Sequence, residues 1–238
     1  MTFSAPHRTL FCLFIMLTCI VTAAENSYAI PMSYKLKKYN ELVQRAIAAD
    51  SESPNFYVQL RRYYSDIEGF NPDGQDIVTQ LNDLAPLVKP QSQNPKDLVV
   101  FENFKRLILT HLGNITVAEN AMYLAQKYPN ILNHARMKHV FYGLYNSLSY
   151  SGNGTTKRSA YDLFTLGEEA MLLEKLGMRS DFRSQEQEGL RTYAIHKATK
   201  IKTGGPHTIY MNISPYAHKL IALQEEADNK SPAISTKK

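Results

Sequence analysis

ILNHARMKHVFYGLYNSLSY, residues 131–150, carries the clearest helical pattern of this chain. Its apolar side chains recur at the three- to four-residue spacing of one helix face. The members of this stripe are Ile131, Ala135, Val140, Phe141, Leu144, Tyr145 and Leu148. The stretch therefore predicts a helix with one buried face.

The same periodicity extends over most of the chain, from about residue 34 to residue 177. It predicts helices over 35–49, 55–67, 75–88, 96–112, 115–128, 131–150 and 156–176. Turn-forming clusters such as Asn71-Pro72-Asp73-Gly74 separate them. Residues 101–129 are similar to one degenerate tetratricopeptide-type helical hairpin, and half of a second copy follows. Because that repeat is stable only in stacks, we expect a compact stack of helical hairpins and not an extended solenoid.

After Gly177 the pattern changes to the alternation of strands. Strands are predicted at 190–201 and 207–213 around the turn Gly204-Gly205-Pro206, with a third near 181–185. A short helix over 215–226 and a disordered polar tail at 227–238 follow.

The expected fold class is therefore mainly α (α+β), with stacked helical hairpins followed by a small C-terminal antiparallel β-hairpin. A single domain would cover 30–226, with its strand pair at about 189–213.

The first 24 residues have the order of a secretory signal peptide. One cation, Arg8, precedes an apolar run over 10–21, and Thr22-Ala23-Ala24 offers cleavage after either alanine. The run is shorter than the roughly 20 residues that a membrane-spanning helix needs. An uncleaved anchor or a lipid-modified Cys19 are the alternatives. We expect an exported protein, periplasmic or extracellular, that meets the membrane only through this segment before cleavage.

Cleavage after Ala24 would remove both cysteines, Cys12 and Cys19. The mature chain would then have neither disulfides nor thiol chemistry. Removing 24 of 238 residues leaves 214, enough for one good-sized domain, and the formal net charge falls from +5 to +4 with the loss of Arg8. Such a mild excess affects solubility and not the fold.

Three segments together resemble an uncharacterised bacterial family of exported proteins, known as domain of unknown function 4919. They are Ser53-Pro54-Asn55-Phe56-Tyr57 with Leu60 and Arg62, then Ser151-Gly152-Asn153-Gly154-Thr155 with Ala160-Tyr161, Glu169, Leu173 and Gly177, and finally Ile209-Tyr210-Met211-Asn212-Ile213. The resemblance implies an exported, helix-rich domain with a terminal strand pair, and it brings no known activity or site. The chain departs from the family at Glu168-Glu169-Ala170, where His-Glu-Tyr is usual, and at Lys157-Arg158, where the turn is usually acidic.

The best candidate ligand site is the glycine loop, residues 151–158, with Glu169 facing inward beneath it. Glycines with positive φ would expose consecutive backbone N–H groups to an anion, and a threonine would cap the next helix. Two cations in the first turn of that helix are unfavourable unless an anion binds there. The candidate residues are Gly152, Asn153, Gly154, Thr155, Thr156, Lys157, Arg158 and Glu169. The alternative is an ordinary turn with two solvated cations.

No catalytic residue, metal ligand or cofactor is assigned. Glu168 and Glu169 point about 100° apart on a helix, so a solvated or salt-bridged face is the simpler interpretation. His196 and His207 would form at most a weak metal site if they met across the strand pair. The basic clusters are too short to follow a nucleic acid, and export argues against that partner.

Two functions are compatible with these patterns. The first is an exported, non-enzymatic binding or assembly module that presents a helical-hairpin groove to an envelope protein or a peptide. The 15 tyrosines, against no tryptophan, also suggest a tyrosine-lined groove for a peptide or glycan. The second is an enzyme or small-anion binder centred on the glycine loop. The oligomeric state is not predicted.

Overall fold

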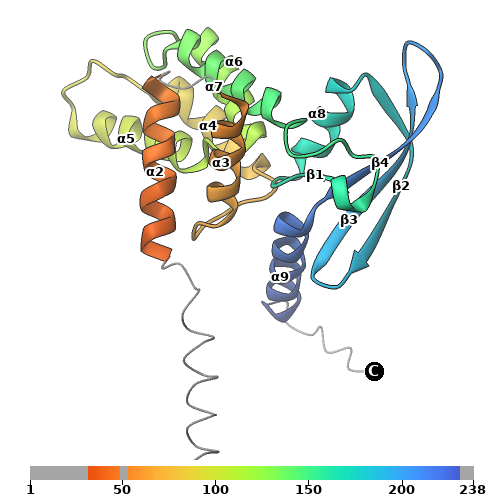
Figure 1. Ribbon diagram of the computed structural model, residues 1–238. Coiled ribbons are helices and arrows are strands. Elements are labelled where there is room, and N and C mark those ends of the chain that lie inside the picture. Colours follow the sequence, from red (N-terminus) through yellow and green to blue (C-terminus); the bar gives the residue numbers. More distant parts are fainter. Residues whose placement is uncertain (1–31, 49–52, 231–238) are drawn as a thin grey trace, which may run out of the picture.

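The computed structural model describes residues 32–48 and 53–230, and it places a group of helices beside a four-stranded sheet (Figure 1). The helices of the first part are α2 (Met32–Ala48), α3 (Pro54–Ser65), α4 (Gln75–Leu84), α5 (Pro95–His111), α6 (Ile115–Lys127) and α7 (His134–Ser147), with a 3₁₀ turn, η1 (Ala85–Leu87), after α4. The first six predicted helices are therefore confirmed, with small differences at their ends. The mainly helical α+β class is confirmed with them.

Local sequence explains where these helices begin. A side-chain oxygen accepts a hydrogen bond from an N–H group of the first turn in four of them, and the capping residues are Ser53, Asn94, Asn114 and Asn133. Pro54 and Pro95 occupy the first turns of their helices, where a missing N–H costs nothing. The helices pack on one cluster of buried apolar side chains, which extends from α2 to the sheet.

The helix predicted over 156–176 is wrong in its first half. A 3₁₀ turn, η2 (Lys157–Ser159), leads into the short strand β1 (Tyr161–Asp162), and helix α8 spans only Gly167–Lys175. Tyr161 and Asp162 pair with Met211 and Asn212 of a strand that lies far along the chain. This sheet pairing buries Tyr161 and overrides the local helical periodicity.

The remaining strands are β2 (Met178–Glu188), β3 (Arg191–Lys200) and β4 (Pro206–Asn212). The sheet has the order β1-β4-β3-β2, with β1 parallel to β4 and the other neighbours antiparallel. The strands predicted at 190–201 and 207–213 are thus the centre of a larger mixed sheet. The strand predicted near 181–185 is the middle of the edge strand β2.

Helix α9 (Ser214–Lys230) packs against β3 and continues past position 226, where the tail was predicted to begin. Positions 231–238 of that tail, and the predicted signal peptide over 1–24, lie outside the described residues. Within residues 32–48 and 53–230, none of the helices combines the length and apolar character needed to cross a bilayer.

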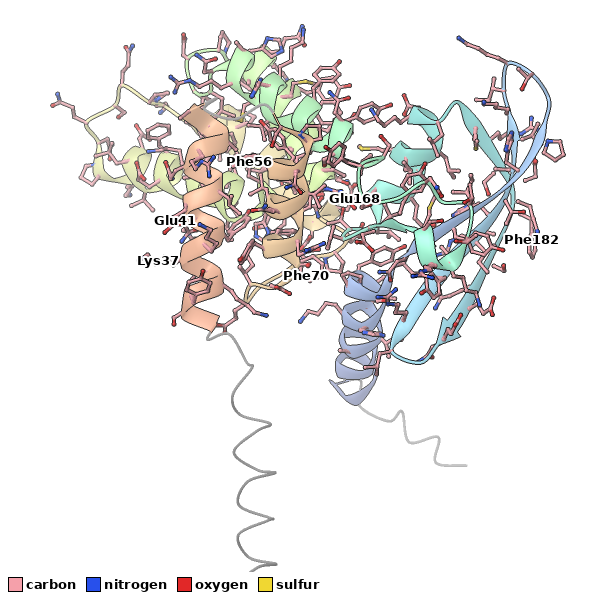
Figure 2. All side chains as sticks on the ribbon, in the orientation of Figure 1. Lys37, Glu41, Phe56, Phe70, Glu168 and Phe182 are labelled. Atoms are coloured by element: carbon pink, nitrogen blue, oxygen red, sulfur yellow. The ribbon has the colours of Figure 1, made fainter. Side chains whose placement is uncertain are left out.

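Helix α8 joins the two parts of the molecule. It contacts α6 on one side and β2 on the other. Figure 2 shows its Glu168 in the interior between helices and sheet, whereas Phe182 points outward from β2. Adjacent acidic residues of α8 can therefore reach both parts.

Candidate functional site

The glycine loop folds back on Ser159. The N–H groups of Asn153 and Gly154 both donate to the Ser159 carbonyl, at 3.0 and 2.8 Å. The Thr155 N–H donates to the Asn153 side chain at 3.1 Å, and the Thr156 N–H donates to the Ser159 hydroxyl at 3.3 Å. The amides proposed to hold an anion therefore already have partners within the chain.

The two glycines of this loop have different reasons to be glycine. Gly154 has the predicted positive φ, at +66°, and a Cβ there would meet the ring of Tyr161. Gly152 is not among the glycines with positive φ, so that expectation was wrong. A Cβ at Gly152 would instead strike the backbone carbonyl of Ala160. Close packing of the loop explains both residues without a ligand.

The cations of the loop also differ in their surroundings. Lys157 Nζ lies 2.5 Å from a carboxylate oxygen of Glu186 and 3.0 Å from one of Glu188. Hydrogen bonds to these carboxylates raise the pKa of Lys157 above its ordinary value. Thr156 caps the short turn η2 and not a long helix, and Arg158 is exposed. Lys157 is thus paired with carboxylates of the edge strand β2. An unpaired cation in the loop was the main reason for expecting a bound anion, and for Lys157 that reason no longer holds.

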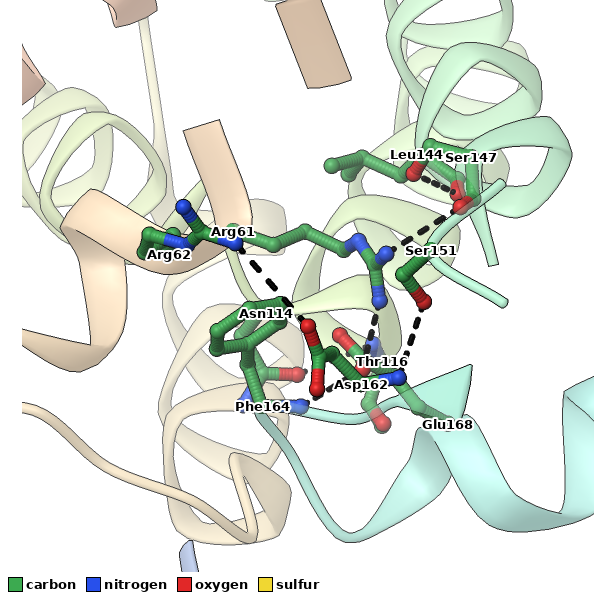
Figure 3. A network of polar contacts seen from close by, with 10 residues as sticks. All are labelled: Arg61, Arg62, Asn114, Thr116, Leu144, Ser147, Ser151, Asp162, Phe164 and Glu168. Carbon is green, nitrogen blue, oxygen red and sulfur yellow. Dashed lines mark hydrogen bonds and ion pairs between the residues drawn. The ribbon is translucent and has the colours of Figure 1, made fainter. Parts of the chain in front are cut away.

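Glu168 and Glu169 diverge, as their spacing predicted, but both are buried. Glu168 lies 2.7 Å from Arg61 Nη1 and accepts a hydrogen bond from the Phe164 N–H at 2.8 Å (Figure 3). The side chains of Arg61 and Glu168 are both 0% exposed, and Arg61 also donates to the Ser147 carbonyl at 3.2 Å. Burial raises the pKa of Glu168 although Arg61 opposes this. This pair fastens α8 to α3 and α7.

Glu169 faces the sheet, where four other polar side chains gather around it. We call these five residues the Glu169 cluster: Glu169, Ser180, Arg183, His196 and Tyr216. Arg183 binds both carboxylate oxygens at 2.8 Å, His196 Nε2 lies 3.1 Å away, and the Tyr216 hydroxyl donates a short hydrogen bond. The Ser180 hydroxyl lies 2.8 Å from His196 Nδ1. Burial alone would raise the pKa of Glu169, but these partners outweigh it and lower the pKa to about 2.

A β-bulge assembles this cluster. The pairing of β2 with β3 shifts register between Ser180 and Phe182, which leaves Asp181 as the extra residue. Side chains three positions apart in a regular strand point to opposite faces. Because of the bulge, Ser180 reaches His196 and Arg183 reaches Glu169 on the same side of the sheet. The sequence carries no signal for such a bulge.

The order Ser180–His196–Glu169 is that of a nucleophile, a base and an acid. The histidine of such a triad becomes a cation during the reaction, and the negative charge of the carboxylate stabilises that cation. Here the bidentate Arg183 already balances the charge of Glu169. His196 is 3% exposed and is held between Ser180 and Glu169. We therefore assign the Glu169 cluster a structural role, as the junction of α8, β2, β3 and α9.

His196 and His207, which could have met across the strand pair, are not cross-strand partners. His196 pairs across the strands with Ile209, and His207 pairs with Ala198. In this strand register the two histidines are not opposite each other. The ring nitrogens of His196 form hydrogen bonds with Ser180 and Glu169 instead. In the described part of the chain, no three His, Cys, Asp or Glu side chains are grouped so as to hold a metal ion.

A groove on the helical side is lined by three tyrosines, and we call it the tyrosine groove. Its volume is about 390 Å³, and α6, α7 and α8 supply its walls. The lining residues are Glu119, Met122, Tyr123, Phe141, Tyr142, Tyr145, Met171 and Glu174. Tyr123 and Tyr142 remain 56% and 46% exposed. The contribution of α8 to this groove had no sequence signal.

A second hollow adjoins the first along α7. It has a volume of about 450 Å³ and shares Tyr142 with the tyrosine groove. Its lining residues are Tyr57, Ala135, Lys138, His139, Tyr142, Gly143 and Asn146. Gly143 lets the ring of Tyr57 pack directly on the helix, because a Cβ there would overlap it. Tyr142 lines both hollows.

Similarity to known proteins does not assign a function. No protein-family model, curated protein or solved structure matches the chain. The geometry of the exposed grooves is thus the basis for a functional proposal.

Proposed function

We propose that the protein is an exported, non-enzymatic binding module that holds a segment of a protein or peptide partner in the tyrosine groove. The observation that carries this proposal is the exposure of Tyr123 and Tyr142 around one hollow. Tyrosine is enriched where partners bind, because it offers a large apolar ring and a hydroxyl with few rotatable bonds. Covering these two rings would bury apolar surface that the chain alone leaves in water.

The shape of the surface favours an extended segment over a compact ligand. The tyrosine groove and the second hollow share Tyr142, and we take the two together as one track for the partner segment, longer than either hollow. Its walls are mainly helix surfaces, and an extended peptide can lie along them with alternate side chains in the two hollows.

The proposal includes the finer architecture and the location predicted from the sequence. Contacts between α2 and α3, between α4 and α5, and between α6 and α7 support a stack of helical hairpins. The strand pair β3–β4 is taken as the family's terminal pair, and the order of residues 1–24 supports export. A reporter joined after Ala29 should leave the cytoplasm; retention would contradict export.

The alternative of an enzyme or small-anion binder at the glycine loop is not carried forward. The loop's amides donate within the chain, and Lys157 is paired with two carboxylates. By contrast, Tyr123 and Tyr142 are 56% and 46% exposed, so both rings are accessible to a partner.

Selection from a random peptide display library tests the proposal. Peptides selected on the purified protein should bind Tyr142→Ala at least about tenfold more weakly, a loss of roughly 1.4 kcal/mol that one buried aromatic contact supplies. Tyr150→Ala is the matched control, because Tyr150 is 60% exposed and lies outside both hollows. Equal binding by both variants, or the failure to select any peptide that depends on Tyr142, would contradict the proposal.

A further inference from the structure

The tyrosine groove has an acidic end. Glu119 of α6 and Glu174 of α8 both line it. We infer that this end binds the ammonium or guanidinium group of a lysine or arginine of the partner; the inference rests on the proposed peptide-binding function.

The first argument is charge. Among the side chains that the structure describes, those of residues 33–48 and 53–222, neither Glu119 nor Glu174 takes part in a salt bridge. Glu119 is half-buried, and burial together with the negative charge of Glu174 raises its pKa. Two carboxylates therefore repel each other in a partly desolvated place, and a cation between them would relieve that repulsion.

The second argument is the aromatic wall. A cation within about 6 Å of a tyrosine ring is attracted by the negative face of the ring. The chain's own Lys175 already uses Tyr145 in this way, with Nζ 4.7 Å from the ring centroid. That ammonium donates to Asn146 at 3.0 Å and not to the groove carboxylates. The exposed rings of Tyr123 and Tyr142 remain for a ligand.

These two features together select among ligand classes. Carboxylates repel an acidic peptide or a phosphorylated one, and an apolar side chain leaves both charges without a partner. A lysine or arginine would form an ion pair with the carboxylates and a cation–π contact with the tyrosine rings. The apolar stem of such a side chain also suits the wall formed by Met122 and Met171.

The test compares peptides selected on the native protein with peptides selected on Glu119→Gln/Glu174→Gln. Native-selected peptides should carry lysine or arginine at a recurrent position, and those from the double variant should not. Replacing that lysine by norleucine should weaken binding to the native protein about tenfold and leave binding to the double variant nearly unchanged. Glu41→Gln/Glu102→Gln is the control, since both carboxylates pair with lysines of their own helices outside this groove.

Methionine methyl groups report where the peptide binds. The NMR signals of Met122 and Met171 should shift on addition of a native-selected peptide, and that of Met137, which lines a different hollow, should not. Peptides that depend on Tyr142 but show no preference for lysine or arginine would overturn this inference and leave the binding function intact. The absence of any peptide that depends on Tyr142 would overturn both.

Discussion

Replacing Arg61 by methionine should destabilise the protein strongly, because it leaves a buried carboxylate without its cation. Arg61 and Glu168 are 2.7 Å apart, and both side chains are 0% exposed. Removing one partner of such a pair typically costs about 3–5 kcal/mol. In a domain of this size, about 2–4 °C of melting temperature corresponds to each kcal/mol, so we expect a fall of about 6–20 °C.

Urea denaturation followed by far-UV circular dichroism measures this loss, and the neighbouring arginine supplies the control. Arg62 is 57% exposed and lies 3.9 Å from Asp162 at the rim of the same network (Figure 3). Exposed ion pairs contribute little, so Arg62→Met should change the free energy of unfolding by less than about 1 kcal/mol. A loss in Arg61→Met no larger than in Arg62→Met would refute the argument from burial.

A double variant separates the unpaired charge from lost packing. Glu168→Gln keeps an acceptor for the Phe164 N–H while it removes the negative charge. Arg61→Met/Glu168→Gln should therefore be more stable than Arg61→Met alone. Lower stability of the double variant would show that packing of the arginine, and not its charge, sets the cost.

The pH dependence of Arg61→Met gives an independent check. The pKa of Glu168 in the folded protein lies above its ordinary 4.5, and loss of Arg61 raises it further. A carboxyl group with a raised folded pKa binds its proton more tightly in the folded state, so the folded state gains stability as the pH falls toward 4.5. The deficit of Arg61→Met should shrink over that interval. A deficit that does not change with pH would contradict this.

Three other variants probe the sheet and the loop beside it. Glu169→Gln should flatten the acid limb of the stability curve: the folded pKa of about 2 lies below the ordinary 4.5, so the native protein loses this contribution as the pH falls between those values. If the free energy of unfolding of the variant and of the native protein changed with pH in the same way, the lowered pKa of Glu169 would be contradicted. Lys157→Ala should lower the melting temperature slightly in dilute buffer and not in high salt, because its ion pairs are exposed to screening; a salt-independent loss would argue for another role. Gly154→Ala should lose more than about 1 kcal/mol, because φ is +66° and a Cβ would meet the ring of Tyr161, whereas Gly205→Ala, with its nearest neighbour at 3.7 Å, should be tolerated. Equal stability of the two alanine variants in urea would contradict this explanation.

Most helices could be predicted because their causes are local. The caps at Ser53, Asn94, Asn114 and Asn133 act on N–H groups two or three residues away, and the apolar stripes follow from helical spacing. The segment 156–176 failed for the opposite reason. Tyr161 pairs with Met211, and no local pattern announces a partner that far along the chain.

The candidate sites show the same division. Local geometry predicted that Glu168 and Glu169 point apart, but their cations, Arg61 and Arg183, are 107 and 14 positions away. The glycine loop contains residues that suit an anion site, yet Ser159 already accepts the two amides that mattered most.

The amino-acid sequence by itself determined the helical first part, its helix starts and the change to strands after Gly177, since these depend on contacts within a few residues. Only the tertiary structure decided the mixed sheet, the partners of the buried carboxylates and the tyrosine groove. The groove combines Glu119, Tyr142 and Glu174 from three helices, and their approach depends on how α8 packs against α6 and α7. Long-range packing, which couples residues without regard to their separation in sequence, therefore sets the chemistry of this surface.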